Sequence, residues 1–198
     1  MRDEIAIVDY GAGNLSSVKK ALDFIGAKSV ITSDPARISG AGRIVLPGVG
    51  SFGDAMKSLE RLRLVAPLRR AIESGKPFLG ICLGMQLLFE KSEESPGTEG
   101  LSILKGEVVK FRKGKVPQIG WNSLEIRKGK ILGNGGFAYF VNSYYVKPED
   151  MAIAASTTTY EDTKFASAVQ KNNIFAVQFH PEKSGAYGLE ILRRWLEC

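Results

Sequence analysis

The first half of the chain alternates strand-like and helix-like hydrophobic patterns joined by short connections. Buried strands are expected at 4–9, 28–32, 43–47 and 76–82. The first helix presents one apolar face, made of Leu15, Val18, Leu22 and Ile25, and further helices are expected at 52–62, 65–74 and 85–90. Strands that alternate with helices form parallel sheets, because each crossover helix packs back onto a face of the sheet. This alternation constrains the fold more than any other feature.

After Pro96 the pattern changes to strand-like segments separated by Gly, Asn or charged turns. These segments are 106–111, 122–127, 137–146, 152–157, 165–170 and 174–179, and a last helix over 186–197 turns Leu189, Leu192, Trp195 and Leu196 inward. No linker or repeat separates the two halves. We therefore expect one α/β domain over 1–198: a three-layer, open, mostly parallel sheet with helices on both faces and added antiparallel strands in the C-terminal half.

Charge and cysteine usage narrow the class of protein. The net charge is +6, but the basic residues are dispersed, and the small clusters at 112–115 and 127–130 contain Gly and resemble solvated turns. We therefore expect no nucleic-acid partner. No apolar run is long enough for a membrane span, and the chain starts without the apolar stretch of a signal peptide. Two cysteines cannot form a disulfide framework, so a reducing cytoplasm is expected and Cys198 is expected to be inert.

Cys82 lies where an expected strand gives way to a helix, within Gly-Ile-Cys-Leu-Gly. This is the pattern of a nucleophile elbow, whose tight turn requires small neighbours on both sides. A helix N-terminus favours a thiolate, and its free N–H groups can stabilise an oxyanion. Gln86, four residues on, shares the helix face with Cys82 and could bind a polar substrate. The alternative is that Cys82 is a small buried apolar residue.

His180, the only histidine of the chain, follows the strand-like segment 174–179. The carboxyl ends of parallel strands meet at one edge of a sheet, so His180 can reach Cys82 there. Glu182 is two residues further on, across Pro181, and could orient the imidazole and stabilise the imidazolium. The alternative is a surface His-Pro-Glu turn without a role, and this reading weakens once Cys82 is considered with it.

Two glycine-rich segments follow strands. Residues 46–54 contain Gly48, Val49 and Gly50, whose backbone N–H groups could supply a second oxyanion donor, but lack the ending of a phosphate-binding loop. The segment 9–14 lacks the third glycine of a dinucleotide fingerprint, so a tight turn with Asn14 capping the first helix is the better interpretation.

The motifs Gly-Ile-Cys-Leu-Gly-Met-Gln, Pro-Gly-Val-Gly and His-Pro-Glu resemble the class I glutamine amidotransferases. Further stretches, among them "DYGAGNLSSV" and "GWNSL" with "YFVNSYY", make the chain similar to the glutaminase subunits of imidazole glycerol phosphate synthases. Such subunits often have histidine where this chain has Gln118 and Asn142. Neither position belongs to the catalytic triplet.

The resemblance implies that Cys82 attacks the carboxamide of L-glutamine, with His180 and Glu182 completing the triad. The N–H groups of Leu83 and of Val49 or Gly50 would bind the oxyanion, and no metal or organic cofactor is needed.

It also implies transfer of ammonia to a separate cyclase subunit with a (β/α)8 barrel, which makes imidazole glycerol phosphate for histidine biosynthesis within a heterodimer. The docking face implied by the resemblance is Asn14, Trp121, Asn122, Tyr139 and Lys183. Trp121 is the expected anchor, and the alternative is a plain core tryptophan. Two alternatives stay open: a glutaminase subunit of an anthranilate or purine pathway enzyme, and a non-catalytic regulatory module of the same fold.

Overall fold

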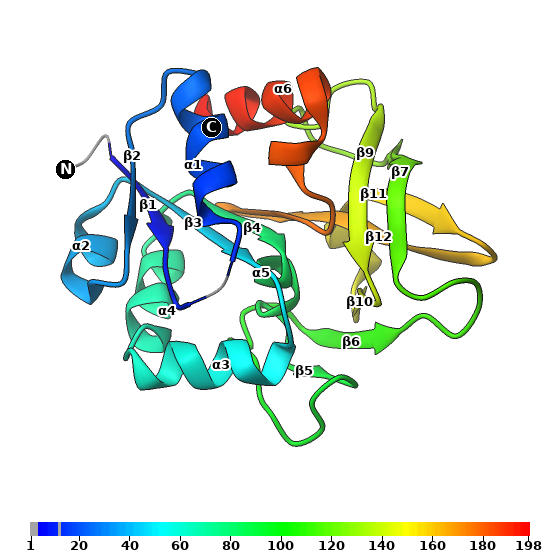
Figure 1. Cartoon of the computed structure of the whole chain (residues 1–198), viewed down its shortest axis with the longest axis horizontal. Coiled ribbons are helices and arrows are strands. Elements are labelled where there is room, and N and C mark those ends of the chain that lie inside the picture. The colour runs from blue at the N-terminus through cyan, green and yellow to red at the C-terminus, as the bar shows by residue number, and fades with distance from the viewer. Residues whose placement is uncertain (1–3, 12) are drawn as a thin grey trace.

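The computed structural model describes residues 4–11 and 13–198 (Figure 1). The start of the chain, where no signal peptide was expected, and the expected turn at 9–14 therefore lie partly outside the described residues. Its main sheet has eight strands in the order β2-β1-β3-β4-β13-β12-β11-β8. These strands are β1 (Ile5–Val8), β2 (Ser29–Thr32), β3 (Arg43–Gly48), β4 (Phe78–Cys82), β8 (Glu125–Ile126), β11 (Ala154–Tyr160), β12 (Thr163–Lys171) and β13 (Ile174–Val177). The expected strands at 4–9, 28–32, 43–47 and 76–82 are confirmed within a few residues.

The sheet is parallel from β2 through β13 and antiparallel beyond it. Since β13 lies beside β4 and parallel to it, the last strand of the chain joins the N-terminal half of the fold. The register pairs Val177 with Ile81, so the segments that follow these two strands leave the sheet at the same edge. The predicted mixed sheet is thus confirmed, and its topology brings Cys82 and His180 together.

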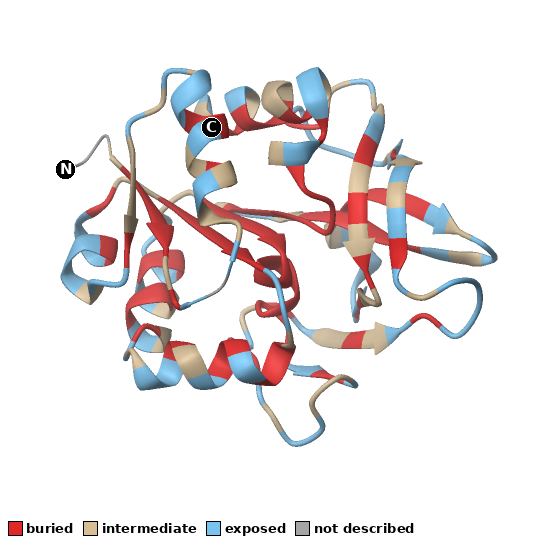
Figure 2. Ribbon diagram, viewed as in Figure 1, coloured by how far each residue is buried: buried red, intermediate tan, exposed pale blue. Residues whose placement is uncertain are grey.

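Helices cover both faces of the sheet and complete three layers (Figure 1). One face packs against α1 (Leu15–Phe24) and α6 (Gly185–Leu196). The other packs against α2 (Pro35–Gly40), α3 (Phe52–Arg61), α4 (Val65–Glu73) and α5 (Leu83–Gln86). Alternate residues of β1 enter the two cores, Ala6 on one side and Ile7 on the other, and the central strands are buried throughout (Figure 2). Among the described residues, no helix has the length and apolar character needed to cross a membrane.

The short helix α2 was missed by the sequence analysis. Its signal was the pair Asp34-Pro35, because the Asp34 carboxylate accepts a hydrogen bond from the N–H of Ala36 and proline occupies the first helical position. In α6 the inward face consists of Gly188, Ile191, Leu192 and Trp195. Leu189 and Leu196, which were expected there, are only partly buried.

Two smaller sheets stand beside the main one. They consist of β5 (Lys91–Ser92), β6 (Gly106–Lys110) and β10 (Tyr144–Pro148), and of β7 (Gln118–Ser123) with β9 (Phe137–Asn142). The expected strand 137–146 therefore divides between two sheets, and 122–127 divides between β7 and β8. The break in the first segment falls at Ser143, whose carbonyl accepts a hydrogen bond from the N–H of Phe111.

The predicted bounds of the helix at 85–90 are wrong. The observed helix α5 begins directly after Cys82 and ends at Gln86. Beyond it, the carbonyl oxygens of Leu87 and Leu88 accept hydrogen bonds from residues 101, 103 and 104 rather than from a following helical turn. Because α5 is a single turn, its dipole supports a thiolate less than a long helix would.

Candidate active site

Cys82 occupies a strained elbow at the end of β4. Its φ and ψ are 54° and −111°, a conformation that residues other than glycine rarely adopt. The flanking glycines are required by space. A Cβ at Gly84 would lie 1.7 Å from the carbonyl oxygen of Leu46, and one at Gly80 would lie 2.9 Å from the carbonyl oxygen of Gly84. The tight strand-to-helix turn expected at Cys82 is therefore present, and the surrounding structure holds its strained conformation.

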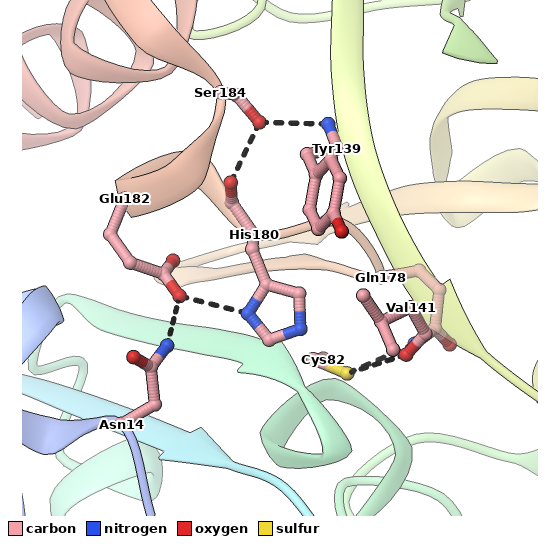
Figure 3. A network of polar contacts seen from close by, with 8 residues as sticks. All are labelled: Asn14, Cys82, Tyr139, Val141, Gln178, His180, Glu182 and Ser184. Atoms are coloured by element: carbon pink, nitrogen blue, oxygen red, sulfur yellow. Dashed lines mark hydrogen bonds and ion pairs between the residues drawn. The ribbon is translucent and has the colours of Figure 1, made fainter. Parts of the chain in front are cut away.

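His180 follows β13 and places its ring between Cys82 and Glu182 (Figure 3). Nδ1 lies 2.8 Å from Oε1 of Glu182, and the ring edge with Nε2 faces Cys82. The backbone of His180 is also fixed, because its N–H donates to the carbonyl of Tyr139 and its carbonyl accepts from the Ser184 hydroxyl. The three residues singled out from the sequence therefore form one connected array.

Asn14 extends this array by one residue. Its Nδ2 donates to Oε1 of Glu182 at 2.5 Å, across 168 positions of sequence. It does hold the position before α1, but with φ of 72° and without a hydrogen bond from its side chain to the helix. Asn14 therefore holds the N-cap position of α1, as expected, but its side chain does not supply the capping hydrogen bond. Its amide instead holds a carboxylate whose side chain is fully buried.

The charge on His180 follows from its surroundings. Burial disfavours the imidazolium, but hydrogen bonds to Cys82 and Glu182, together with the negative charges of both groups, outweigh it and raise the pKa of His180 to about 10. At neutral pH the ring of His180 is therefore protonated, and it lies between Cys82 and Glu182. A thiolate next to an imidazolium is an activated nucleophile with a proton donor beside it.

A titration can check this directly because the chain has one histidine. The ordinary pKa of a histidine is about 6.5. As the pH is raised, we expect the NMR signals of isotope-labelled His180 to remain those of an imidazolium well beyond that value and to titrate with a pKa of about 10. Glu182→Gln should lower the midpoint, because it removes a neighbouring negative charge and a hydrogen-bond acceptor. A wild-type midpoint near the ordinary value would contradict the ion pair.

Two glutamines lie beside the thiol. Nε2 of Gln178 lies 3.6 Å from Sγ of Cys82, and Nε2 of Gln86 donates to Oε1 of Gln178 and to the carbonyl of Tyr144. Both amide hydrogens of Gln86 are thus used within the protein, which leaves its oxygen to accept from a substrate. Gln178 was missed by the sequence analysis. Its signal was a polar residue inside a buried run, two positions before His180.

A cavity of about 290 Å³ opens onto the array. Its walls include Cys82, His180 and, except for Gly48, the residues expected to bind the oxyanion or the substrate, namely Val49, Gly50, Leu83 and Gln86. Gly48 pairs with Cys82 in the strand register and lies outside the cavity wall. Gly50 has a φ of 101°, a conformation suited to glycine.

Another part of the cavity wall consists of residues that were not expected from the sequence to bind the substrate. It includes Glu94, Pro117 and the segment 141–144. Gln118 and Asn142, the two departures from the family pattern, pair across β7 and β9 and are both buried. Asn142 lines the cavity and donates from Nδ2 to the carbonyl of Tyr144.

An exposed apolar face lies on the two-stranded sheet near the cavity. Ile119, Trp121 and Phe137 are 62%, 56% and 64% exposed. Trp121 packs edge-on against Tyr139, with ring centroids 6.0 Å apart. The core alternative for Trp121 is therefore wrong. Ile119 and Phe137 were missed. In β7 the apolar Ile119 and Trp121 alternate with Gln118, Gly120 and Asn122 and face outward, whereas β9 is apolar on both faces.

Two other residues expected at a docking face, Lys183 and Asn122, differ in how free their side chains are to meet a partner. Lys183 is exposed and lines the cavity. Asn122 donates to the carbonyl of Thr159 and its oxygen accepts from the N–H of Ser123, so its amide serves the chain's own backbone.

Cys198 is exposed and lies outside this region, with its thiol against the carbonyl of Arg194. Within residues 4–11 and 13–198, no group of three His, Cys, Asp or Glu side chains could hold a metal ion.

Comparisons with known proteins agree with this geometry. Residues 6–197 match the family model described as glutamine amidotransferase class-I. The chain is 54% identical over 197 residues to imidazole glycerol phosphate synthase subunit HisH of Pyrococcus furiosus, covering 98% of each chain. It is 52% identical to the same subunit of Aquifex aeolicus, covering 96% of this chain and 94% of the relative. A crystal structure of a glutamine amidotransferase matches with a TM-score of 0.79 at 20% identity over 97% of both chains, which shows the shared fold.

Proposed function

Because the chain belongs to the class I glutamine amidotransferase family, we propose that it is the glutaminase subunit of an imidazole glycerol phosphate synthase. It hydrolyses L-glutamine to glutamate and ammonia and supplies the ammonia to histidine biosynthesis. The observation that carries this proposal is the strained Cys82 facing the His180–Glu182 pair at the wall of a cavity. We propose that it acts in the cytoplasm, because two free cysteines, one of them the proposed nucleophile, suit a reducing compartment.

In the first half of the reaction, the thiolate of Cys82 attacks the side-chain carbonyl carbon of glutamine. The negative charge moves to the carbonyl oxygen, where the N–H of Leu83 and an N–H of the 48–50 segment stabilise it. His180 donates its Nε2 proton to the carboxamide nitrogen, the C–N bond breaks and ammonia leaves. A γ-glutamyl thioester remains on Cys82, and His180 is neutral.

In the second half, neutral His180 removes a proton from water, and the resulting hydroxide attacks the thioester carbonyl. The same N–H groups stabilise the second oxyanion, the C–S bond breaks, and glutamate leaves as the thiolate re-forms. Glu182 holds the ring orientation in both halves and stabilises the imidazolium at the beginning and the end. Asn14 in turn holds Glu182.

The subunit works in a complex, as the names of its relatives indicate. We propose that the partner is a cyclase subunit with a (β/α)8 barrel that receives ammonia through an internal passage. Ammonia released into water would be protonated and lose its nucleophilic lone pair. The exposed apolar face of β7 and β9, with Lys183 beside it, is the docking surface that suits such a partner.

The two alternatives are supported less well. A purine-type partner would predict close similarity to purine-pathway chains, yet the PurLQS structure of Thermotoga maritima shares 19% identity with this chain. A non-catalytic module would have no use for backbone strain at Cys82 or for a buried carboxylate on His180.

The docking surface gives a testable expectation. Trp121→Ala should weaken binding to the cyclase subunit by roughly 30-fold or more, because a partly exposed tryptophan commonly anchors an interface. Phe24→Ala is the matched control. Phe24 is the last residue of α1, outside the two-stranded sheet of β7 and β9, and is 72% exposed. Isothermal titration calorimetry measures both, and equal affinities for the two variants would reject the anchor.

Coupling to the partner is tested by three glutaminase assays: the chain alone, with the cyclase subunit, and with the cyclase subunit plus its acceptor substrate. We expect the rate to rise at each step, because Gly50 allows the oxyanion loop to change its peptide orientation. Equal rates in all three would reject coupling.

A further inference from the structure

Tyr10 carries a buried hydroxyl that the mechanism above does not use. The residue is 2% exposed, and its hydroxyl has no hydrogen-bond partner among the described residues. Leaving a hydroxyl buried without a partner destabilises a fold, and phenylalanine would fill the same space without that penalty. Burial, and secondarily the negative charge of Cys82, raise the pKa of Tyr10 well above its usual value. The group is therefore a permanent hydrogen-bond donor.

The hydroxyl lies directly behind the oxyanion loop. A Cβ at Gly48 would lie 2.1 Å from Oη of Tyr10, so the absence of a side chain at Gly48 makes room for the hydroxyl. Gly48 pairs with Cys82 in the register of β3 and β4. The hydroxyl is thus placed against the backbone of the segment that would bind the oxyanion.

The next two residues of the loop lie between two hollows. Val49 and Gly50 line the cavity at Cys82, and they also line a second hollow of about 150 Å³ that includes Tyr10. A peptide group carries its N–H and its carbonyl on opposite sides. When a peptide of this segment turns its N–H toward Cys82, its carbonyl turns toward the side of Tyr10.

We propose that Tyr10 is a positioning residue for the oxyanion loop: its hydroxyl donates to a carbonyl oxygen of the 48–50 segment when an N–H of the same segment faces the cavity at Cys82. The hydrogen bond stabilises the loop form that binds the tetrahedral intermediate. This inference rests on the proposed glutaminase function, and it adds a residue that does not touch the substrate.

The test is Tyr10→Phe, assayed in the complex with the cyclase subunit. Glutamine hydrolysis should fall about three- to tenfold in kcat, the range of one hydrogen bond, with little change in KM. Alkylation of Cys82 by iodoacetamide is the second readout. It is a displacement at a saturated carbon that forms no oxyanion, so its rate should not change. Thermal stability should be equal or higher, because the substitution removes a buried hydroxyl that has no partner in residues 4–11 and 13–198.

Tyr187→Phe is the matched control. The Tyr187 hydroxyl donates to the carbonyl of Leu132, away from the cavity, so its loss should lower stability and leave glutaminase activity unchanged. Equal kcat for Tyr10→Phe and wild type would overturn the inference alone. A loss of iodoacetamide reactivity in Tyr10→Phe would also overturn the inference, because the substitution would then act on the reactivity of the Cys82 thiol. A loss of thermal stability would overturn it too, because the substitution would then act on packing. Absence of hydrolysis by the wild-type complex would overturn the proposed function and the inference together.

Discussion

Replacing Cys82 with serine is expected to reduce glutamine hydrolysis by roughly 10⁴-fold or more, because the members of a catalytic triad act as a unit. The substitution is nearly isosteric and leaves the elbow glycines in place, so the fold and the binding of the cyclase subunit should be retained. The measurement is glutamate release by the complex, with circular dichroism and thermal unfolding as checks on the fold.

Cys198→Ser is the control for this experiment, since Cys198 is the other thiol of the chain and lies exposed at its end. Its replacement should leave the rate unchanged. Iodoacetamide should inactivate the Cys198→Ser protein as fast as wild type. Glutaminase activity in Cys82→Ser within tenfold of wild type would reject the nucleophile.

His180→Asn should cause a loss of similar size. No second imidazole exists in the chain, so no neighbour can take over proton donation to the leaving nitrogen. Asparagine can keep a hydrogen bond to Glu182 but cannot carry a proton between the two halves of the reaction. Steady-state glutaminase assays of the complex give the rate, and retention of wild-type turnover would show that His180 is not the acid–base group.

Glu182→Gln separates orientation from proton transfer. It leaves the thiol and the imidazole in place, and the amide can still accept from Nδ1, so the loss should be roughly 10- to 100-fold smaller than for His180→Asn. The Asn14 amide, which now donates to a carboxylate, would then face an uncharged partner. A loss equal to that of His180→Asn would instead assign Glu182 a direct part in proton transfer.

The sequence predicted the parts of this site that depend on local geometry. The glycines around Cys82 predicted a tight strand-to-helix turn, and the contacts that a Cβ would make at Gly80 and Gly84 explain why. The position of His180 after a buried strand predicted its arrival at the same sheet edge, which the pairing of β13 with β4 confirms. In both cases the information lies within about ten consecutive residues.

What depends on tertiary partners could not be predicted. The end of α5 is set by hydrogen bonds from residues 101–104 to the carbonyls of Leu87 and Leu88. The division of 137–146 between two sheets, and the turn of the Asn14 amide toward Glu182, likewise require contacts between distant segments. The hydroxyl of Tyr10, which has no partner among the described residues, has no signature in the sequence, since a tyrosine two residues after a buried strand is typical of an ordinary core.

We propose above that the chain cleaves glutamine through a thioester on Cys82, and this intermediate can be detected. The most direct measurement is mass spectrometry of the complex after rapid acid quench during turnover, followed by digestion. We expect a peptide that contains Cys82 and carries one added γ-glutamyl group, which hydroxylamine removes and which Cys82→Ser lacks. Turnover of glutamine at the same rate without any adduct on that peptide would contradict it.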